Sequence, residues 1–103
     1  MYKQKVVEED LKELYQSILT LDNVEEFKIF FEDLCTVDEL KTLAQRWQVV
    51  QMLYEKNKYS DIMKETGASS TTISRVKKCL DYGEGYLMVL NRNDKKNIDK
   101  NKE

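Results

Sequence analysis

A single glycine between two short amphipathic stretches constrains the fold of this chain more than any other feature. Residues 59–80 read YSDIMKETGASSTTISRVKKCL, with Gly67 near the middle. Gly67 stands where a helix end favours a residue that tolerates φ > 0. The apolar residues around it have the spacing that packs two helices across a tight turn: Ile62, Met63, Ala68, Ile73, Val76 and Leu80. The segment therefore predicts a helix-turn-helix over about 59–80.

The second helix of this motif is expected to expose hydroxyl and basic side chains. The residues left facing outward are Ser69, Ser70, Thr71, Thr72, Ser74, Lys77 and Lys78. Such a face is typical of a recognition helix that enters the DNA major groove. A plain helical hairpin is the alternative, because glycine is ordinary in its turn and Ser or Thr is an ordinary N-cap. The run of four hydroxyl residues followed by bases favours DNA.

The distribution of charge supports the same partner. The net charge of −2 argues by itself against nucleic acid. However, residues 1–40 carry 4 bases and 11 acids, a net charge of −7, whereas residues 56–78 carry 6 bases and 2 acids, a net charge of +4. Salt screens charges beyond about 8–10 Å, so the local charge matters more than the total. The basic stretch coincides with the predicted motif.

The composition excludes several classes of protein. A chain of 103 residues with no Pro, 3 Gly and 35% charged residues predicts one small all-α fold. Two Cys and no His provide no set of zinc ligands, so we expect neither metal nor cofactor. Without His or a Gly-rich phosphate loop, an enzyme is not expected. No apolar run reaches the length of a membrane span, and the N-terminus lacks a signal peptide's apolar block, so we expect a cytoplasmic protein with no membrane partner.

Apolar periodicity predicts about six helices in a single domain over residues 1–91. The first two helices are expected over about 8–21 and 24–34. A short apolar segment at 86–90 is expected to form the last helix. The polar residues 92–103 are expected to form a disordered tail.

A long third helix is expected between these elements, from a capping box of Thr36 and Glu39 to about Asn57. Its apolar residues cover more than one face. One small subunit does not readily cover such a helix. We therefore expect a homodimer, which the two-fold symmetry of helix-turn-helix proteins also favours.

From Leu34 to Leu80 the chain resembles the Trp repressor superfamily. The segments that carry the resemblance are Thr36-Val37-Asp38-Glu39, Arg46 within the long helix, and GASSTTISR from Gly67 to Arg75. The following phrase RVKKCLDYGEGY looks more like the YerC/YecD-type branch than like the tryptophan-sensing repressor. The resemblance implies an all-α, intertwined homodimer that presents two helix-turn-helix units about one DNA turn apart.

Carried over by position, the resemblance implies a first motif helix over 59–66 and a recognition helix over 70–80. The residues nearest base edges are then Ser69, Ser70, Thr71 and Thr72. The residues that bind DNA phosphates are Lys58, Ser60, Lys64, Ser74, Lys77 and Lys78. Hydroxyls give broad base readout, whereas the phosphate contacts set register and salt-dependent affinity.

The resemblance extends less well to the ligand site of the tryptophan-sensing member. Thr36, Arg46 and Arg75 match the residues that surround the ligand there, and a bidentate Arg suits a carboxylate. The glycine that admits the indole is Val76 in this chain, and the serine that receives the ammonium is Cys79. We therefore expect no tryptophan binding. A different small-molecule co-regulator is left open, and a structural role for Arg46 and Arg75 is the alternative.

Two functional hypotheses follow from the sequence. The first is a transcriptional regulator, expected to be a repressor, that binds double-stranded DNA as a homodimer. The second is a helical protein-interaction dimer that has kept the fold and lost DNA binding, which the acidic N-terminal half favours.

Overall fold

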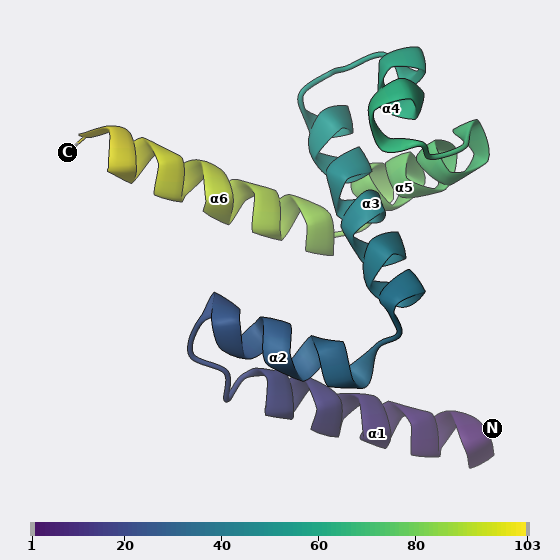
Figure 1. Cartoon of the computed structure of the whole chain (residues 1–103), viewed down its shortest axis with the longest axis vertical. Helices are drawn as coiled ribbons and strands as arrows, with labels where there is room; N and C mark the ends of the chain where they lie inside the picture. The colour runs from purple at the N-terminus through teal and green to yellow at the C-terminus, as the bar shows by residue number, and fades with distance from the viewer. Residues whose placement is uncertain (1, 103) are drawn as a thin grey trace. The chain divides into compact units, whose positions relative to one another are not determined.

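The computed structural model describes the backbone of residues 2–102 and the side chains of residues 7–96 (Figure 1). Over this range the chain is all-α, with no strand. Its six helices are α1 (Tyr2–Ile18), α2 (Val24–Leu34), α3 (Val37–Tyr54), α4 (Tyr59–Thr66), α5 (Ser70–Tyr82) and α6 (Gly85–Lys102). The predicted fold class of about six helices is thereby confirmed. The chain divides into two compact units, Met1–Leu40 and Lys41–Glu103, and the boundary falls inside α3.

The core of the second unit is built from α3, α4, α5, α6 and the turn between α4 and α5. Its buried apolar residues are Val49, Val50, Ile62, Ala68, Ile73, Val76, Leu80 and Leu90. Val49, Val50, Ile62 and Ile73 have no exposed surface at all. Burial of one such side chain stabilises the fold by about 1.5–3 kcal/mol. Met63 differs from the prediction, because 42% of its surface is exposed.

The turn between α4 and α5 is held by hydrogen bonds on both of its sides. Gly67 adopts φ 75°, and its N–H donates to the Met63 carbonyl at 2.9 Å. The Thr66 hydroxyl accepts from the Ala68 N–H at 3.1 Å. From α3, the Gln45 side-chain amide donates to the Thr66 carbonyl at 3.0 Å. These bonds satisfy groups that the end of a helix leaves free, and they attach the turn to α3.

Three helices begin with side-chain caps. The predicted capping box is confirmed: the Glu39 N–H donates to the Thr36 hydroxyl at 3.1 Å, and the Thr36 N–H donates to the Glu39 carboxylate at 2.8 Å. Asn23 caps α2. The Ser69 hydroxyl accepts from the Thr72 N–H at 3.2 Å and donates to the Thr72 hydroxyl at 3.1 Å. The Ser69 hydroxyl is therefore occupied by hydrogen bonds at the point where the turn ends and α5 begins.

The α3 helix ends three residues before the predicted Asn57. Its last residue is Tyr54, and Lys56 adopts φ 67°, a left-handed conformation that stops a helix. The Asn57 side-chain amide then donates to the Met52 carbonyl at 3.0 Å. An asparagine after the helix thus stabilises the stop rather than extending the helix.

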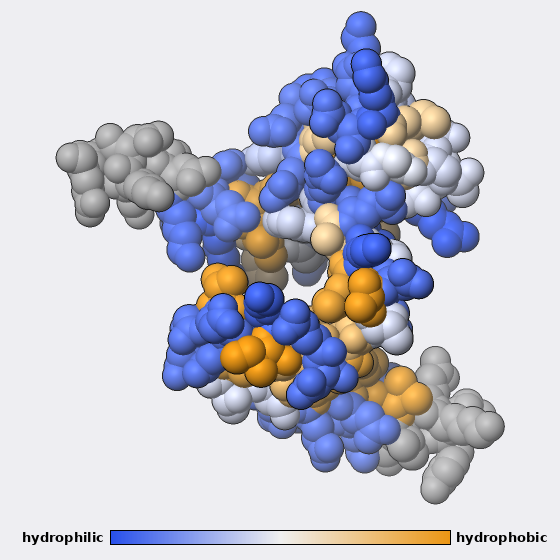
Figure 2. All heavy atoms as spheres, in the orientation of Figure 1, coloured by the Kyte–Doolittle hydropathy of each residue, from blue (hydrophilic) through white to orange (hydrophobic). Residues whose placement is uncertain are grey.

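The first unit contains α1, α2 and the first turn of α3. Its first helix ends at Ile18, earlier than the predicted residue 21. Within residues 7–40 no side chain is buried. Figure 2 shows apolar side chains at the surface of this unit, among charged ones. The large apolar residues that are exposed here are Val7, Leu11, Tyr15, Leu19, Val24, Phe27, Ile29, Leu34 and Val37.

The C-terminal stretch differs from the predicted disordered tail. The helix α6 begins at Gly85 and continues to Lys102. No Pro or Gly follows Gly85 to interrupt it. The Tyr54 hydroxyl of α3 donates to the Asp94 carboxylate at 2.7 Å, which anchors α6 beyond its apolar part. This bond to a carboxylate raises the pKa of Tyr54 above its usual value of 10.0. The assignment of residues 1–91 to one domain stays a prediction.

We expect Gly67→Ala to lower the free energy of unfolding by about 1–2 kcal/mol, because an L-residue pays this much for a left-handed conformation. Space does not explain the effect, since a Cβ at Gly67 would meet only the Gln45 amide nitrogen, at 3.9 Å. Gly85→Ala is the matched control, because a Cβ there meets nothing within 4 Å. Urea denaturation measures both variants, and equal losses would contradict the proposed origin.

We expect Ser69→Ala to destabilise the protein by about 1 kcal/mol, since it removes the N-cap of α5. Ser70→Ala should change stability little, because Ser70 is exposed at the first helical position. Thermal unfolding followed by circular dichroism compares the two neighbours. An equal effect of both substitutions would show that the Ser69 cap contributes nothing special.

Candidate nucleic-acid interface

The helices α4 and α5 place one face of α5 outward. Their ranges, 59–66 and 70–82, agree with the predicted motif helices, and α5 extends two residues further. On α5, Ile73, Val76 and Leu80 are buried against the core of the second unit. Residues that lie about half a turn from these three must face solvent. The core therefore determines which side chains α5 can offer to a partner.

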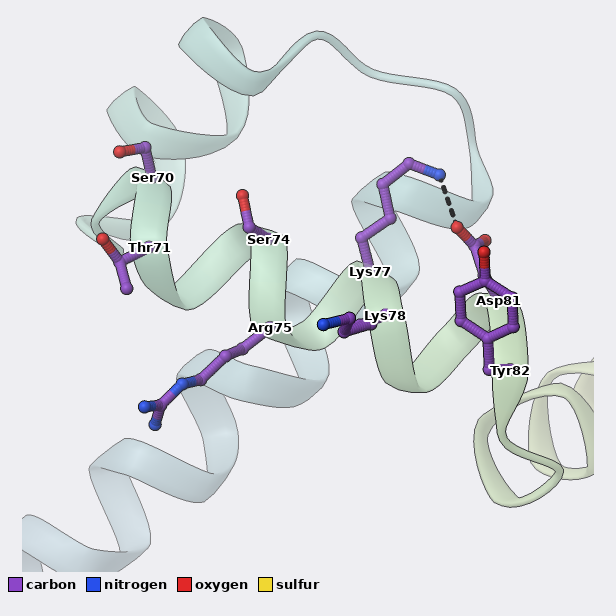
Figure 3. A pocket seen from close by; sticks show the side chains of 8 residues that line it. All are labelled: Ser70, Thr71, Ser74, Arg75, Lys77, Lys78, Asp81 and Tyr82. Carbon is purple, nitrogen blue, oxygen red and sulfur yellow. Dashed lines mark hydrogen bonds and ion pairs between the residues drawn. The ribbon is translucent and has the colours of Figure 1, made fainter.

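A shallow hollow of about 510 Å³ lies along this outward face of α5 (Figure 3). Its lining residues are Ser70, Thr71, Ser74, Arg75, Lys77, Lys78, Asp81 and Tyr82. All eight come from the one helix, so the hollow is a feature of a helix surface and not an enclosed ligand cavity. The lining contains three cationic side chains, three with hydroxyl groups, one carboxylate and one phenol. This surface can donate many hydrogen bonds and attract anions.

Four exposed residues of this face follow each other at helical spacing. Thr71, Arg75, Lys78 and Tyr82 are four, three and four residues apart, which aligns them along one side of α5. We call these four residues the outer stripe. It extends over about 16 Å at a rise of 1.5 Å per residue. Its last member, Tyr82, is 85% exposed.

Two of the four predicted base-reading residues have a different place. Ser69 and Thr72 do not line the hollow, and their hydroxyls bond to each other at the start of α5. Thr72 is half-buried. Ser70 and Thr71 are exposed and line the hollow. The structure thus brings Ser70 and Thr71 together with Ser74 and the basic side chains of α5. Ser69 and Thr72 instead take part in capping the helix.

Lys77 and Lys78, which are both predicted to bind phosphates, are not equivalent in the structure. The Lys77 ammonium pairs with the Asp81 carboxylate at 2.8 Å. This bond raises the pKa of Lys77 above its usual value of 10.5. Lys78 lies in the outer stripe, and Figure 3 shows its side chain apart from the Lys77–Asp81 pair. An exposed pair of this kind contributes little stability, so Lys77 can leave Asp81 for a phosphate.

The remaining phosphate candidates lie on α4. Lys58 precedes its first residue, Ser60 lies in its first turn and Lys64 in its last turn. All three are exposed, and none lines the hollow of α5. Positions beside a recognition surface suit contacts to the DNA backbone rather than to bases.

The three ligand candidates belong to two different units of the chain. The Thr36 hydroxyl caps α3 and belongs to the first unit, whereas Arg46 and Arg75 belong to the second. Arg46 is exposed on α3. Arg75 lines the hollow of α5, whose lining includes neither Arg46 nor Thr36. Val76, which replaces the family's glycine, is 3% exposed and belongs to the core.

Sequence reasoning missed Asp81 and Tyr82 and gave Arg75 a different role. Both missed residues line the hollow, and Asp81 holds Lys77. Counting four, seven and eleven residues from Thr71 would have revealed the alignment of Arg75, Lys78 and Tyr82. Within residues 7–96, no group of acidic, Cys or His side chains is arranged to hold a metal ion. No helix in the described part of the chain is long and apolar enough to cross a membrane.

Comparisons with known proteins identify a family and a relative of this chain. The family described as Trp repressor protein matches residues 9–94. The uncharacterized protein YerC of Bacillus subtilis (strain 168) is 50% identical over 93 residues, which are 89% of this chain and 89% of YerC.

Two solved structures share the fold. A TrpR-like protein from Eubacterium eligens ATCC 27750 is 45% identical with a TM-score of 0.80, over 84% of this chain and 90% of the other. A proposed Trp repressor from Staphylococcus aureus is 46% identical with a TM-score of 0.81, over 91% of this chain and 95% of the other. The match over most of the sequence and the shared arrangement of helices show that this chain belongs to the Trp repressor family.

Proposed function

We propose that the protein is a sequence-specific DNA-binding regulator of transcription that acts as a homodimer and represses its target genes in the cytoplasm. The single observation that carries this proposal is the hollowed, cation-rich face of α5 in a chain of the Trp repressor family. Regulators of this family are DNA-binding proteins and not enzymes. The proposal for this chain adds the residues, the oligomeric state and the sign of regulation.

The dimensions of the exposed α5 surface suit the major groove of DNA. The outer stripe extends over about 16 Å, and the groove, about 12 Å wide, admits an α-helix. Ser70, Thr71 and Ser74 lie at the N-terminal half of α5, the part of a recognition helix that contacts base edges. Lys58, Lys64 and Lys77 lie where they can hold phosphates on either side. These lysines supply affinity for any duplex, and the hydroxyls supply sequence preference.

The first unit supports the proposal of a dimer. None of the side chains in residues 7–40 is buried, and nine large apolar ones are exposed there. Water-exposed apolar surface on this scale is typical of a protein–protein interface. A second copy of the chain covers it, and two-fold symmetry then presents two α5 helices to half-sites about 34–36 Å apart.

Tryptophan is not part of this proposal. Val76 belongs to the core at the position where the tryptophan-sensing member has room for an indole. Trp47 occupies space nearby in the same unit: it packs against the core, and its ring centre is 6.1 Å from that of Tyr86. We propose that DNA binding needs no added ligand.

A protein-interaction dimer that has lost DNA binding is the second candidate function. The net charge of −7 over residues 1–40 favours it, because acidic surfaces repel DNA and attract basic proteins. Binding of a protein partner through residues 1–34, by a chain that shows no salt-dependent binding to DNA, would support this candidate against the first.

Selection from random duplex DNA, with purified protein and no ligand, tests the main proposal. We expect an enriched palindrome with half-sites one helical turn apart. On that duplex, Lys64→Ala should weaken binding to all sequences alike and reduce the slope of log K against log salt by about 0.9. Thr71→Ala should leave this slope unchanged and relax the sequence preference.

Lys28→Ala is the matched control, since Lys28 is an exposed lysine of α2 outside the proposed surface. Titrations by fluorescence anisotropy at several salt concentrations measure all three variants. If Lys64→Ala and Thr71→Ala behaved alike, the division between phosphate and base contacts would be wrong. If nothing were enriched, the protein-interaction dimer would replace the main proposal.

Sedimentation equilibrium should show a particle with twice the mass of one chain. Phe27→Glu should shift the protein toward monomers, because it places a charge on the apolar surface of α2, where Phe27 is 39% exposed. Lys28→Glu, at the next residue, should leave the dimer intact. A wild-type monomer at micromolar concentration would contradict the proposed dimer.

A further inference from the structure

The most specific hydrogen-bonding group on the α5 surface is the Arg75 guanidinium. Arg75 lies four residues after Thr71, and both line the same hollow. Figure 3 shows its side chain extended away from α5, on the other side from the Lys77–Asp81 pair. Arg75 is exposed. Within residues 7–96, the described ion pair joins Lys77 to Asp81, and no carboxylate pairs with the Arg75 guanidinium. Its five N–H donors are therefore available to a ligand outside the chain.

We propose that Arg75 reads a guanine in each half-site and is the main determinant of base preference. The inference rests on the proposed function, because it concerns the same contact between α5 and the major groove. A guanine offers O6 and N7 as neighbouring acceptors, and the planar fork of an Arg binds both at once. The hydroxyls of Ser70, Thr71 and Ser74 can donate or accept, so they distinguish bases poorly.

The position of Arg75 along α5 agrees with this role. The rise from Thr71 to Arg75 is about 6 Å, which spans roughly two base pairs at 3.4 Å each. Arg75 thus follows the first hydroxyls into the groove, while Lys77 is turned toward Asp81. Arg75 is the sixth residue of α5, and its long side chain reaches further toward a base edge than the short hydroxyls do.

The same geometry disfavours a carboxylate clamp for a co-regulator. A clamp within one chain needs a second group facing Arg75 from another element, and every residue of this chain that lines the hollow belongs to α5. The neighbouring Val76 is buried in the core, so it leaves no slot beside Arg75 for a ligand ring. The guanidinium extends from the outward face of α5, where it can enter a DNA groove.

Base-modified duplexes test this inference. The duplex selected by the wild-type protein is prepared with each guanine replaced in turn by 7-deazaguanine, which loses the N7 acceptor and keeps its base pairing. We expect one position per half-site to weaken wild-type binding roughly 5- to 100-fold, as for loss of part of a bidentate Arg–guanine contact. Arg75→Ala should bind the unmodified duplex less tightly by a similar factor and be insensitive to the replacement.

Two further variants separate charge from shape. Arg75→Lys keeps the charge and loses the fork, so it should keep the salt dependence and lose most of the sensitivity to that guanine. Lys64→Ala should bind more weakly and remain as sensitive as the wild type. Arg75→Lys also keeps the test valid if Arg75→Ala does not fold.

Several results would overturn the inference while leaving the proposed function intact. These are a selected site without guanine, a wild-type protein insensitive to every replacement, or an Arg75→Ala variant as sensitive as the wild type. Failure of the wild-type protein to enrich any sequence would instead overturn the proposed function, and the inference with it.

Discussion

The packing of Ile62 and Ile73 against Val49 and Val50 is the constraint on which the candidate interface depends. These four residues come from α3, α4 and α5 and have no exposed surface. Because they hold α5 by its Ile73–Val76–Leu80 side, the opposite side must face solvent. The hydroxyls and bases of the outer face are available for this reason, and a change in that packing would rotate a different set of side chains outward.

The cationic side chains of this surface differ in their electrostatic partners. Lys77 is paired with Asp81, whereas Arg75 and Lys78 point outward from the same helix. A surface that recognises DNA needs both attraction to any duplex and discrimination between base sequences. Different chemical groups supply these two properties. Point charges on flexible stems attract any phosphate, and a planar fork selects one arrangement of acceptors. Asp81 also lowers the local positive charge of this surface.

Local signals in the sequence were sufficient to predict most of the helices. Gly67 marked the turn, Thr36 and Glu39 formed the expected capping box, and the bounds implied by the resemblance to the Trp repressor superfamily agree with the motif helices within two residues. The end of α3 was missed because it depends on the left-handed conformation of Lys56. Apolar periodicity does not predict the extension of α6, because the stretch is polar and the contact between Tyr54 and Asp94 joins residues 40 apart.

The sequence by itself determined the fold class, the place of the motif and the basic character of its second helix, since these follow from neighbouring residues and their spacing. Only the tertiary structure decided which of the eligible side chains face outward together. In the structure, Ser69 and Thr72 form the cap of α5, Lys77 pairs with Asp81, and Arg75 lines the same hollow as Thr71. The physical reason is that composition tells which groups a helix carries, whereas the rotation of that helix is set by the core it packs against.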